Sequence, residues 1–252
     1  MKQVTFTTFF TIICLLCTCQ VYDVGGPESS HLKYVLKSHN DVHIMPSFSL
    51  ENQLITDNYN HTNKIGPYRF GYEHITELDL NNSGVWDVLE NGDRIWRIKL
   101  KCIGAYSVNI IFTDFYIPNN GHVHIYNEDH SMVVGAYTSK NNNSNDILGT
   151  DLIKGDVMVV EYFEPIQEKG QGRLLIGMVV HGYRDINNWF PLKVNESGAC
   201  NMDVICPDGL SWANEIRSVA RIYNGGGLCT GTLLNNTLQN GTPYLLTANH
   251  CG

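Results

Sequence analysis

The sequence contains no basic cluster, no apolar run long enough to be a confident transmembrane helix, and no long helical period. Its 252 residues carry a net charge of −8 at pH 7. This charge argues against a nucleic-acid partner, because such proteins present lysine and arginine to phosphates. The apolar stretch at residues 6–16 is interrupted by threonine and is shorter than the roughly 20 residues that cross a bilayer. These absences favour a soluble, β-rich protein.

The N-terminus has the layout of a secretory signal peptide. Lys2 supplies the positive charge, and polar residues follow the apolar stretch at 6–16. We therefore expect residues 1–20 to be a signal segment and the protein to be secreted. Cys19 offers an alternative as a lipidated cysteine, although the threonine before it fits that signal poorly. Membrane attachment is expected only if Cys19 is lipidated.

The cysteine count is odd outside the signal segment. Of eight cysteines, three fall within residues 1–20, and the five that remain are Cys102, Cys200, Cys206, Cys229 and Cys251. Disulfides persist in exported proteins, and an odd count leaves at least one thiol without an internal partner. Two interpretations stay open: a chain cut short, or a buried free thiol at Cys102.

Composition divides the rest of the chain into three parts. Residues 21–75 are polar and broken by prolines, so we expect an irregular segment there. Residues 76–193 contain β-branched and aromatic runs separated by glycine, proline and asparagine clusters, which is typical of a β-sandwich. After Lys193 the character changes, with four cysteines and three consecutive glycines at 225–227. We expect residues 194–252 to form a separate domain.

Three short motifs in this last part occur in a recognisable order. They are Cys200-Asn201 with Cys206-Pro207, then Cys229-Thr230-Gly231-Thr232-Leu233, then Leu246-Thr247-Ala248-Asn249-His250-Cys251-Gly252. Together they resemble the start of the mature domain of the bacterial lysyl endopeptidase family, which belongs to the trypsin-like serine peptidases. Residues 115–126 are also similar to a run in the precursors of that family.

The resemblance implies a fold and several residue roles. The chain would be mainly β, a β-sandwich pro-domain followed by the N-terminal part of a trypsin-like double β-barrel. His250 matches the histidine that takes the proton from the serine nucleophile. Cys229 and Cys251 match a disulfide beside that histidine, whereas Cys200 and Cys206 match cysteines whose partners lie further along the family domain. Lys193, just before the matching block, is a candidate processing site.

The chain departs from the family pattern after His250. It contains no Gly-Asp-Ser-Gly-like nucleophile segment, and no aspartate comes after the histidine. We therefore expect a secreted serine endopeptidase precursor that is cut off early in its catalytic domain and is inactive alone. Its expected substrate is a polypeptide, and the family likeness implies cleavage after lysine. No cofactor is expected, and the chain is expected to be a monomer.

Two alternatives accompany this interpretation. An exported β-sandwich without a nucleophile fits a binding or adhesion module that has no catalytic activity. His122, His124 and His130 form a histidine-rich stretch that resembles a metal site, but we favour surface histidines and expect no metal.

Overall fold

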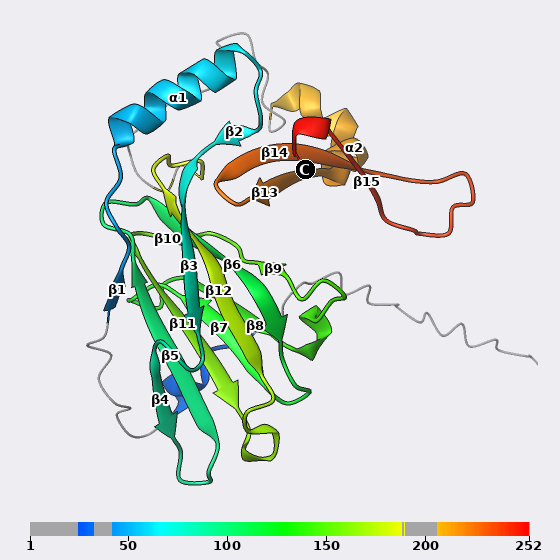
Figure 1. Cartoon of the computed structure of the whole chain (residues 1–252). Coiled ribbons are helices and arrows are strands. Elements are labelled where there is room, and N and C mark those ends of the chain that lie inside the picture. Colours follow the sequence, from blue (N-terminus) through cyan, green and yellow to red (C-terminus); the bar gives the residue numbers. More distant parts are fainter. Residues whose placement is uncertain (1–24, 33–41, 188, 190–205, 252) are drawn as a thin grey trace, which may run out of the picture.

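The computed structural model describes residues 25–32, 42–187, 189 and 206–251. The expected signal segment, Lys193 and Cys200 lie outside these residues. The chain is mainly β, as the sequence predicts. Figure 1 shows two large sheets packed against each other and a smaller third sheet near the C-terminus, with helices beside it.

The first large sheet has the strand order β1-β5-β11-β7-β8, and β4 also pairs with β5. Its only parallel pair among the described strands is β1 with β5. The strands are β1 (Val42–Ile44), β4 (Val85–Val88), β5 (Arg94–Lys101), β7 (His122–Tyr126), β8 (Val133–Tyr137) and β11 (Val157–Glu164).

The second large sheet has the order β10-β6-β12-β3, and β9 also pairs with β6. All of its pairs are antiparallel. The strands are β3 (Gly71–Asp79), β6 (Ser107–Tyr116), β9 (Leu148–Gly149), β10 (Ile153–Lys154) and β12 (Arg173–Gly182).

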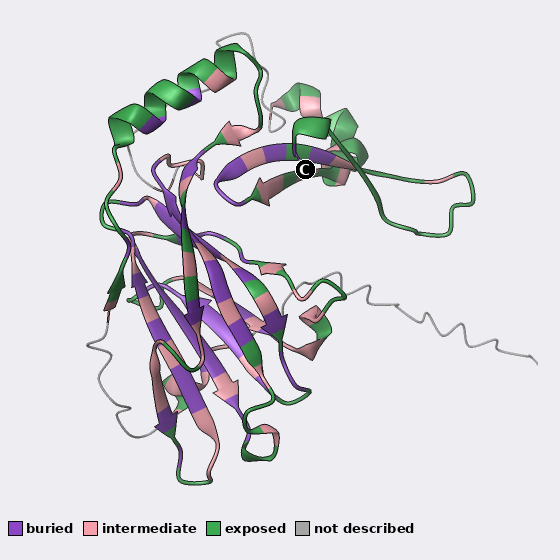
Figure 2. Cartoon of the chain, in the orientation of Figure 1, coloured by how far each residue is buried: buried purple, intermediate pink, exposed green. Residues whose placement is uncertain are grey.

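The core lies between these two sheets. Trp96 of β5, Phe112 of β6 and Tyr162 of β11 are fully buried in one cluster, and Figure 2 shows the buried stripes along both sheets. Successive side chains of a strand point to opposite faces of its sheet, so every second side chain of these strands points into this interior. The predicted sandwich is therefore present. Its strands begin with β3 at Gly71, except for β1, which comes from further upstream in the sequence.

The segment expected to be irregular, residues 21–75, instead contains the helix α1 (Leu50–Thr62). The hydroxyl of Ser49 caps this helix by accepting a hydrogen bond from the Asn52 amide at 3.3 Å. The two buried residues of the helix are Gln53 and Asp57. Because the inward side is polar, no apolar period marks the helix in the sequence.

The third sheet joins distant parts of the chain. β13 (Val219–Asn224), β14 (Gly227–Leu234) and β15 (Tyr244–Thr247) form an antiparallel meander. The short β2 (Tyr68–Arg69) pairs with Gly227 and Leu228 of β14. Every residue of β15 is exposed, so the described part of this sheet is open and does not close into a barrel.

Short helices complete the structure. The remaining α-helix, α2 (Ala213–Ser218), leads into β13. None of the helices within the described ranges is long and apolar enough to cross a membrane. The 3-10 helices are η1 (Glu28–His31), η2 (Ser139–Asn141), η3 (Ile166–Glu168), η4 (Pro207–Trp212) and η5 (Asn249–Cys251).

Candidate active-site histidine

His250 lies in a tight turn at the end of strand β15. The Cys251 amide donates a hydrogen bond to the Ala248 carbonyl at 3.0 Å, which closes η5. Just before this turn, the Thr247 hydroxyl donates to the Thr230 carbonyl of β14 at 2.9 Å. The turn leaves the His250 side chain exposed while its neighbour Cys251 is buried.

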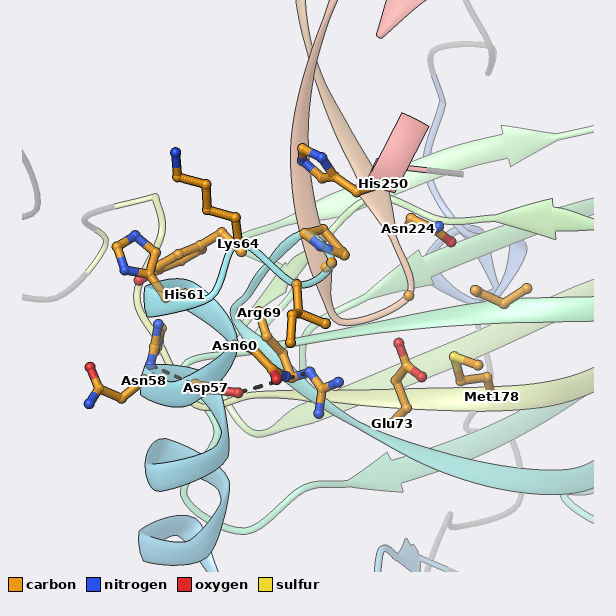
Figure 3. A pocket seen from close by; sticks show the side chains of 18 residues that line it. Asp57, Asn58, Asn60, His61, Lys64, Arg69, Glu73, Met178, Asn224 and His250 are labelled. Atoms are coloured by element: carbon orange, nitrogen blue, oxygen red, sulfur yellow. Dashed lines mark hydrogen bonds and ion pairs between the residues drawn. The ribbon is translucent and has the colours of Figure 1, made fainter. Parts of the chain in front are cut away.

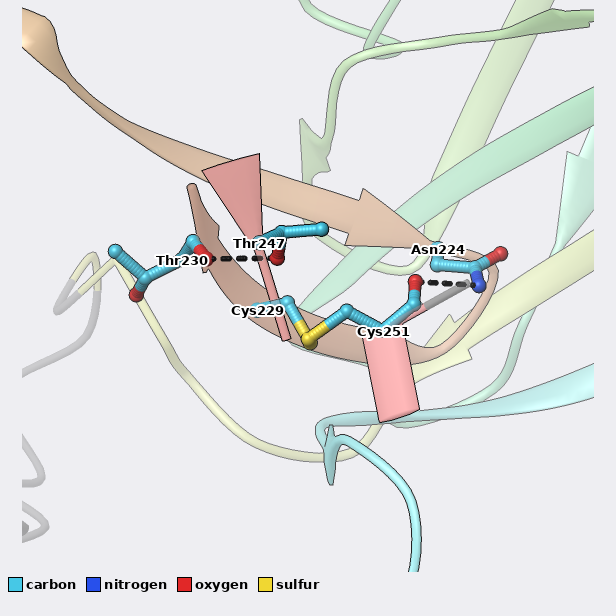
Figure 4. The surroundings of a disulfide bond; sticks show 5 residues. All are labelled: Asn224, Cys229, Thr230, Thr247 and Cys251. Atoms are coloured by element: carbon cyan, nitrogen blue, oxygen red, sulfur yellow. Dashed lines mark hydrogen bonds between the residues drawn. A yellow bond between two sulfur atoms is a disulfide. The ribbon is translucent and has the colours of Figure 1, made fainter. Parts of the chain in front are cut away.

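A disulfide joins Cys229 of β14 to Cys251, as the resemblance implies. Their Cα atoms are 6.0 Å apart, and both residues are buried. The Asn224 side-chain amide donates to the Cys251 carbonyl at 3.3 Å, as Figure 4 shows. The backbone next to His250 is therefore fixed to β14 by a covalent bond and to the end of β13 by a hydrogen bond.

His250 lines a cleft of about 1040 Å³ between the third sheet and the upstream part of the chain. The upstream part contributes Asp57 and residues 64–69, together with Glu73. Figure 3 shows the imidazole above this cleft and the end of helix α1 across from it. The site is therefore built from residues about 180 positions apart in the sequence.

The carboxylates of the cleft are bonded to other groups. Asp57 accepts hydrogen bonds from the Tyr183 hydroxyl at 2.7 Å and from the Arg184 guanidinium at 3.2 Å. Burial and the hydrogen bond to Asp57 raise the pKa of Tyr183. Glu73 accepts from the Gly226 amide at 2.8 Å. Both carboxylates thus stabilise the fold. This agrees with the expectation that the acid that orients the histidine is a different residue.

A nucleophile is missing from the described cleft. No serine, threonine or free cysteine is among the described residues that line it. Cys102 is fully buried, and burial and the nearby Asp156 raise the pKa of its thiol to about 12, so the thiol stays protonated. Cys206 is a half-buried free thiol before η4, and its expected disulfide stays a prediction. The described residues that line the cleft therefore include His250 but no serine.

The histidine-rich stretch is only partly on the surface. His130 is exposed and stacks on Tyr126, with the ring centres 4.3 Å apart. His124 is buried, so the expectation of a surface histidine is wrong there. It lines a small pocket together with residues of η1. The centres of the His124 and His122 rings are 5.3 Å apart. Burial, with smaller effects of His122 and His31, lowers the pKa of His124 to about 4.

One group of three ligating side chains is close enough for a metal ion among the described residues. It consists of Cys229, His250 and Cys251, whose ligand atoms lie within 4.8 Å of one another. Both sulfur atoms of this group are in the disulfide. Since thiolates are the metal-binding form of cysteine, this group does not form a cysteine metal centre in the oxidised protein.

An antiparallel sheet that leads to an exposed histidine beside a disulfide is the arrangement that the resemblance to trypsin-like serine peptidases implies. Comparison with known families agrees with this class. Residues 194–252 match the family described as lysyl endopeptidase, C-terminal domain. The match includes the third-sheet strands β13 to β15, both disulfide cysteines and His250. It covers less than a quarter of the chain and supports a hydrolase of the lysyl endopeptidase type for this segment.

The sequence does not reveal the part of the cleft that comes from residues 64–69. Gly66 and Pro67 mark a turn there, but nothing local connects this turn with His250. The three glycines at 225–227 stand out in the sequence only as a change in composition. In the structure they lie against Glu73, Gly71 and Pro67, respectively.

Proposed function

We propose that this chain belongs to the precursor of a secreted serine endopeptidase in which His250 is the general base. The observation that carries the proposal is the position of this imidazole: exposed in a cleft, next to a disulfide, in the segment that matches the lysyl endopeptidase domain. Histidine suits this role because its ordinary pKa of about 6.5 lets it accept and return a proton near neutral pH.

The proposed chemistry is acyl transfer. The imidazole takes the proton of a serine hydroxyl as the oxygen attacks the peptide carbonyl, and then passes that proton to the leaving amine. We propose that the serine and the orienting acid follow Gly252 in the full-length gene product. Cleavage after lysine, and removal of the sandwich as a pro-domain by cleavage at Lys193, are part of the same proposal and draw on the family likeness.

The test is hydrolysis of a lysyl ester by the processed form of the full-length gene product. We expect His250→Ala to lower kcat/KM by about 10³-fold or more, the loss typical of a missing catalytic base. His130→Ala is the matched control, because His130 is an exposed histidine on the sandwich. Full activity of the His250→Ala variant would rule out the proposed role.

The alternative function is an exported binding or adhesion module. The lack of a nucleophile among the described cleft residues favours it. The gene sequence beyond Gly252 separates the two proposals. An open frame that encodes an aspartate and a Gly-x-Ser-Gly segment supports the peptidase, and a stop codon directly after Gly252 supports the binding module.

A further inference from the structure

We propose that residues 65–73, which we call the docking segment, bind the glycine turn at residues 225–227 and thereby occupy the edge of β14 on which a polypeptide substrate of His250 would lie. The inhibitory part of this inference rests on the proposed function of His250. The docking itself rests on contacts within the described chain. It is supported by several hydrogen bonds, by the close approach of the docking segment to three glycines, and by an apolar cluster.

The backbone of the docking segment continues the third sheet. Tyr68 and Arg69 pair with Leu228 and Gly227 on β14. Beyond this pair, the amides of Phe70 and Gly71 both donate to the Gly226 carbonyl, at 2.8 and 3.1 Å. The Gly226 amide in turn donates to the Glu73 carboxylate at 2.8 Å. Gly226 thus has both of its backbone polar groups bound by the docking segment.

The approach is close enough to explain why these three positions are glycine. A Cβ atom at Gly226 would lie 2.1 Å from the Gly71 carbonyl oxygen, and one at Gly225 would lie 2.2 Å from a Glu73 carboxylate oxygen. A Cβ atom at Gly227 would lie 2.7 Å from the Pro67 ring.

Turn geometry does not explain the whole triplet. Among these three glycines, Gly225 alone has a positive φ, 55°, in the range that favours glycine. At Gly226 and Gly227 the backbone is open to other residues, and the limit is the space left by the docking segment. The triplet is therefore shaped by what it binds.

Apolar side chains close the same contact. Phe70 is fully buried in a cluster with Leu152 and Val180 of the sandwich, and Tyr223 and Leu228 of the third sheet pack against this cluster. The rings of Phe70 and Tyr223 are 5.9 Å apart in an edge-to-face arrangement. Burial of these apolar side chains stabilises the contact more than solvent-exposed hydrogen bonds alone would.

The position of the docking segment makes this contact inhibitory. β2 and β15 lie along the same edge of β14, one after the other, and His250 follows directly after β15. Both His250 and residues 64–69 line the cleft. An extended polypeptide adds to a free strand edge, and here this part of the edge is already paired. While it stays docked, the sandwich therefore keeps a polypeptide from adding to this part of the edge, although the His250 side chain itself is exposed.

Hydrogen exchange of the full 252-residue chain tests the docking without any catalysis. We expect Gly226→Ala to make the Phe70 and Gly71 amides exchange about tenfold faster or more, because the new methyl group displaces the Gly71 carbonyl. Gly149→Ala is the control, since a Cβ atom there meets nothing within 4 Å. Glu73→Ala is a second variant that loosens the turn from the sandwich side. Unchanged exchange at Phe70 and Gly71 in both variants would overturn the proposal.

Hydrolysis of a lysine-containing polypeptide by the full-length precursor tests the inhibition. We expect Glu73→Ala to raise the rate of the uncleaved precursor, while the same change leaves the processed enzyme as active as wild type. If the Glu73→Ala precursor hydrolyses the polypeptide no faster than the wild-type precursor, the inhibitory role is wrong although the proposed function stands. If no form hydrolyses the polypeptide but exchange is accelerated, the proposed function is wrong and the docking stands.

Discussion

The disulfide partner of Cys251 determines how firmly the neighbouring His250 is held. Cys229 and Cys251 close a loop with a sequence separation of 22. We predict that replacing both cysteines by serine lowers the free energy of unfolding of the C-terminal sheet by about 3 kcal/mol, mainly through the entropy of the unfolded chain. Urea unfolding followed by hydrogen exchange at β14 measures this loss.

Cys206→Ser is the matched control for the disulfide variant. This free, half-buried thiol is outside the disulfide, so the substitution should change stability by less than about 0.5 kcal/mol. Equal effects of the two variants would show that the disulfide does not stabilise the sheet.

Buried histidines make the sandwich sensitive to acid. The pKa values of His124 and His181 are both lowered to about 4, chiefly by burial. Below pH ~6.5 the unfolded chain therefore binds protons that the folded chain does not, and stability falls as the pH drops toward 4. Each histidine contributes up to about 3 kcal/mol to this loss.

Urea midpoints at pH 7 and pH 4.5 check this sign. We predict that His124→Gln reduces the difference between the two midpoints, because a group that titrates only in the unfolded state has been removed. His130→Gln, on the exposed side chain that stacks on Tyr126, should leave the difference unchanged. A wild-type midpoint that rises on acidification would contradict the prediction.

At the scale of elements, a polar anchor holds helix α1. Asp57 accepts hydrogen bonds from Gln53 within the helix and from Tyr183 and Arg184 beyond strand β12. We predict that Asp57→Ala lowers the free energy of unfolding by about 2–3 kcal/mol, because it leaves buried donors without an acceptor. Glu51→Ala, on the exposed side of the same helix, should cost far less. Urea unfolding compares the two, and equal losses would contradict the anchor.

The sequence predicted those elements whose apolar residues point inward. The alternating runs correspond to β5, β6, β7, β11 and β12, which form the centre of both sheets, and to β8 at the edge of the first sheet. Strand β3 was not predicted, because a polar residue is buried and an apolar residue is exposed at neighbouring positions: His74 is buried, and Ile75 is 75% exposed. Helix α1 was missed because its buried residues are polar. In both, contacts with distant parts of the chain outweigh local pattern.

The candidate site was predictable where it depends on neighbours in the sequence. Motif order was enough to single out His250 and its flanking cysteine. The docking segment could not be found in this way, because its pairing with β14 joins positions 68–69 with 227–228. No local signal encodes a contact over that distance, and only the fold brings the two segments together.

For the molecule as a whole, the proposed function predicts the site at which the sandwich is cleaved from residues 194–252. The family match begins at residue 194, directly after Lys193. We predict that the processed protein has Val194 as its first residue and that Lys193→Gln blocks its formation. Lys169→Gln, an exposed lysine on the sandwich, is the control. N-terminal sequencing of the secreted product reads the result, and a start elsewhere would rule out Lys193.

If His250 is the general base, it activates a serine for attack on a carbonyl. A fluorophosphonate reacts with activated serines, so its rate of labelling the processed form of the full-length gene product tests this role. We expect rapid labelling of the wild type and a rate lower by about 10³-fold or more in His250→Ala. Equal labelling rates, or no labelling of the wild type, would contradict it.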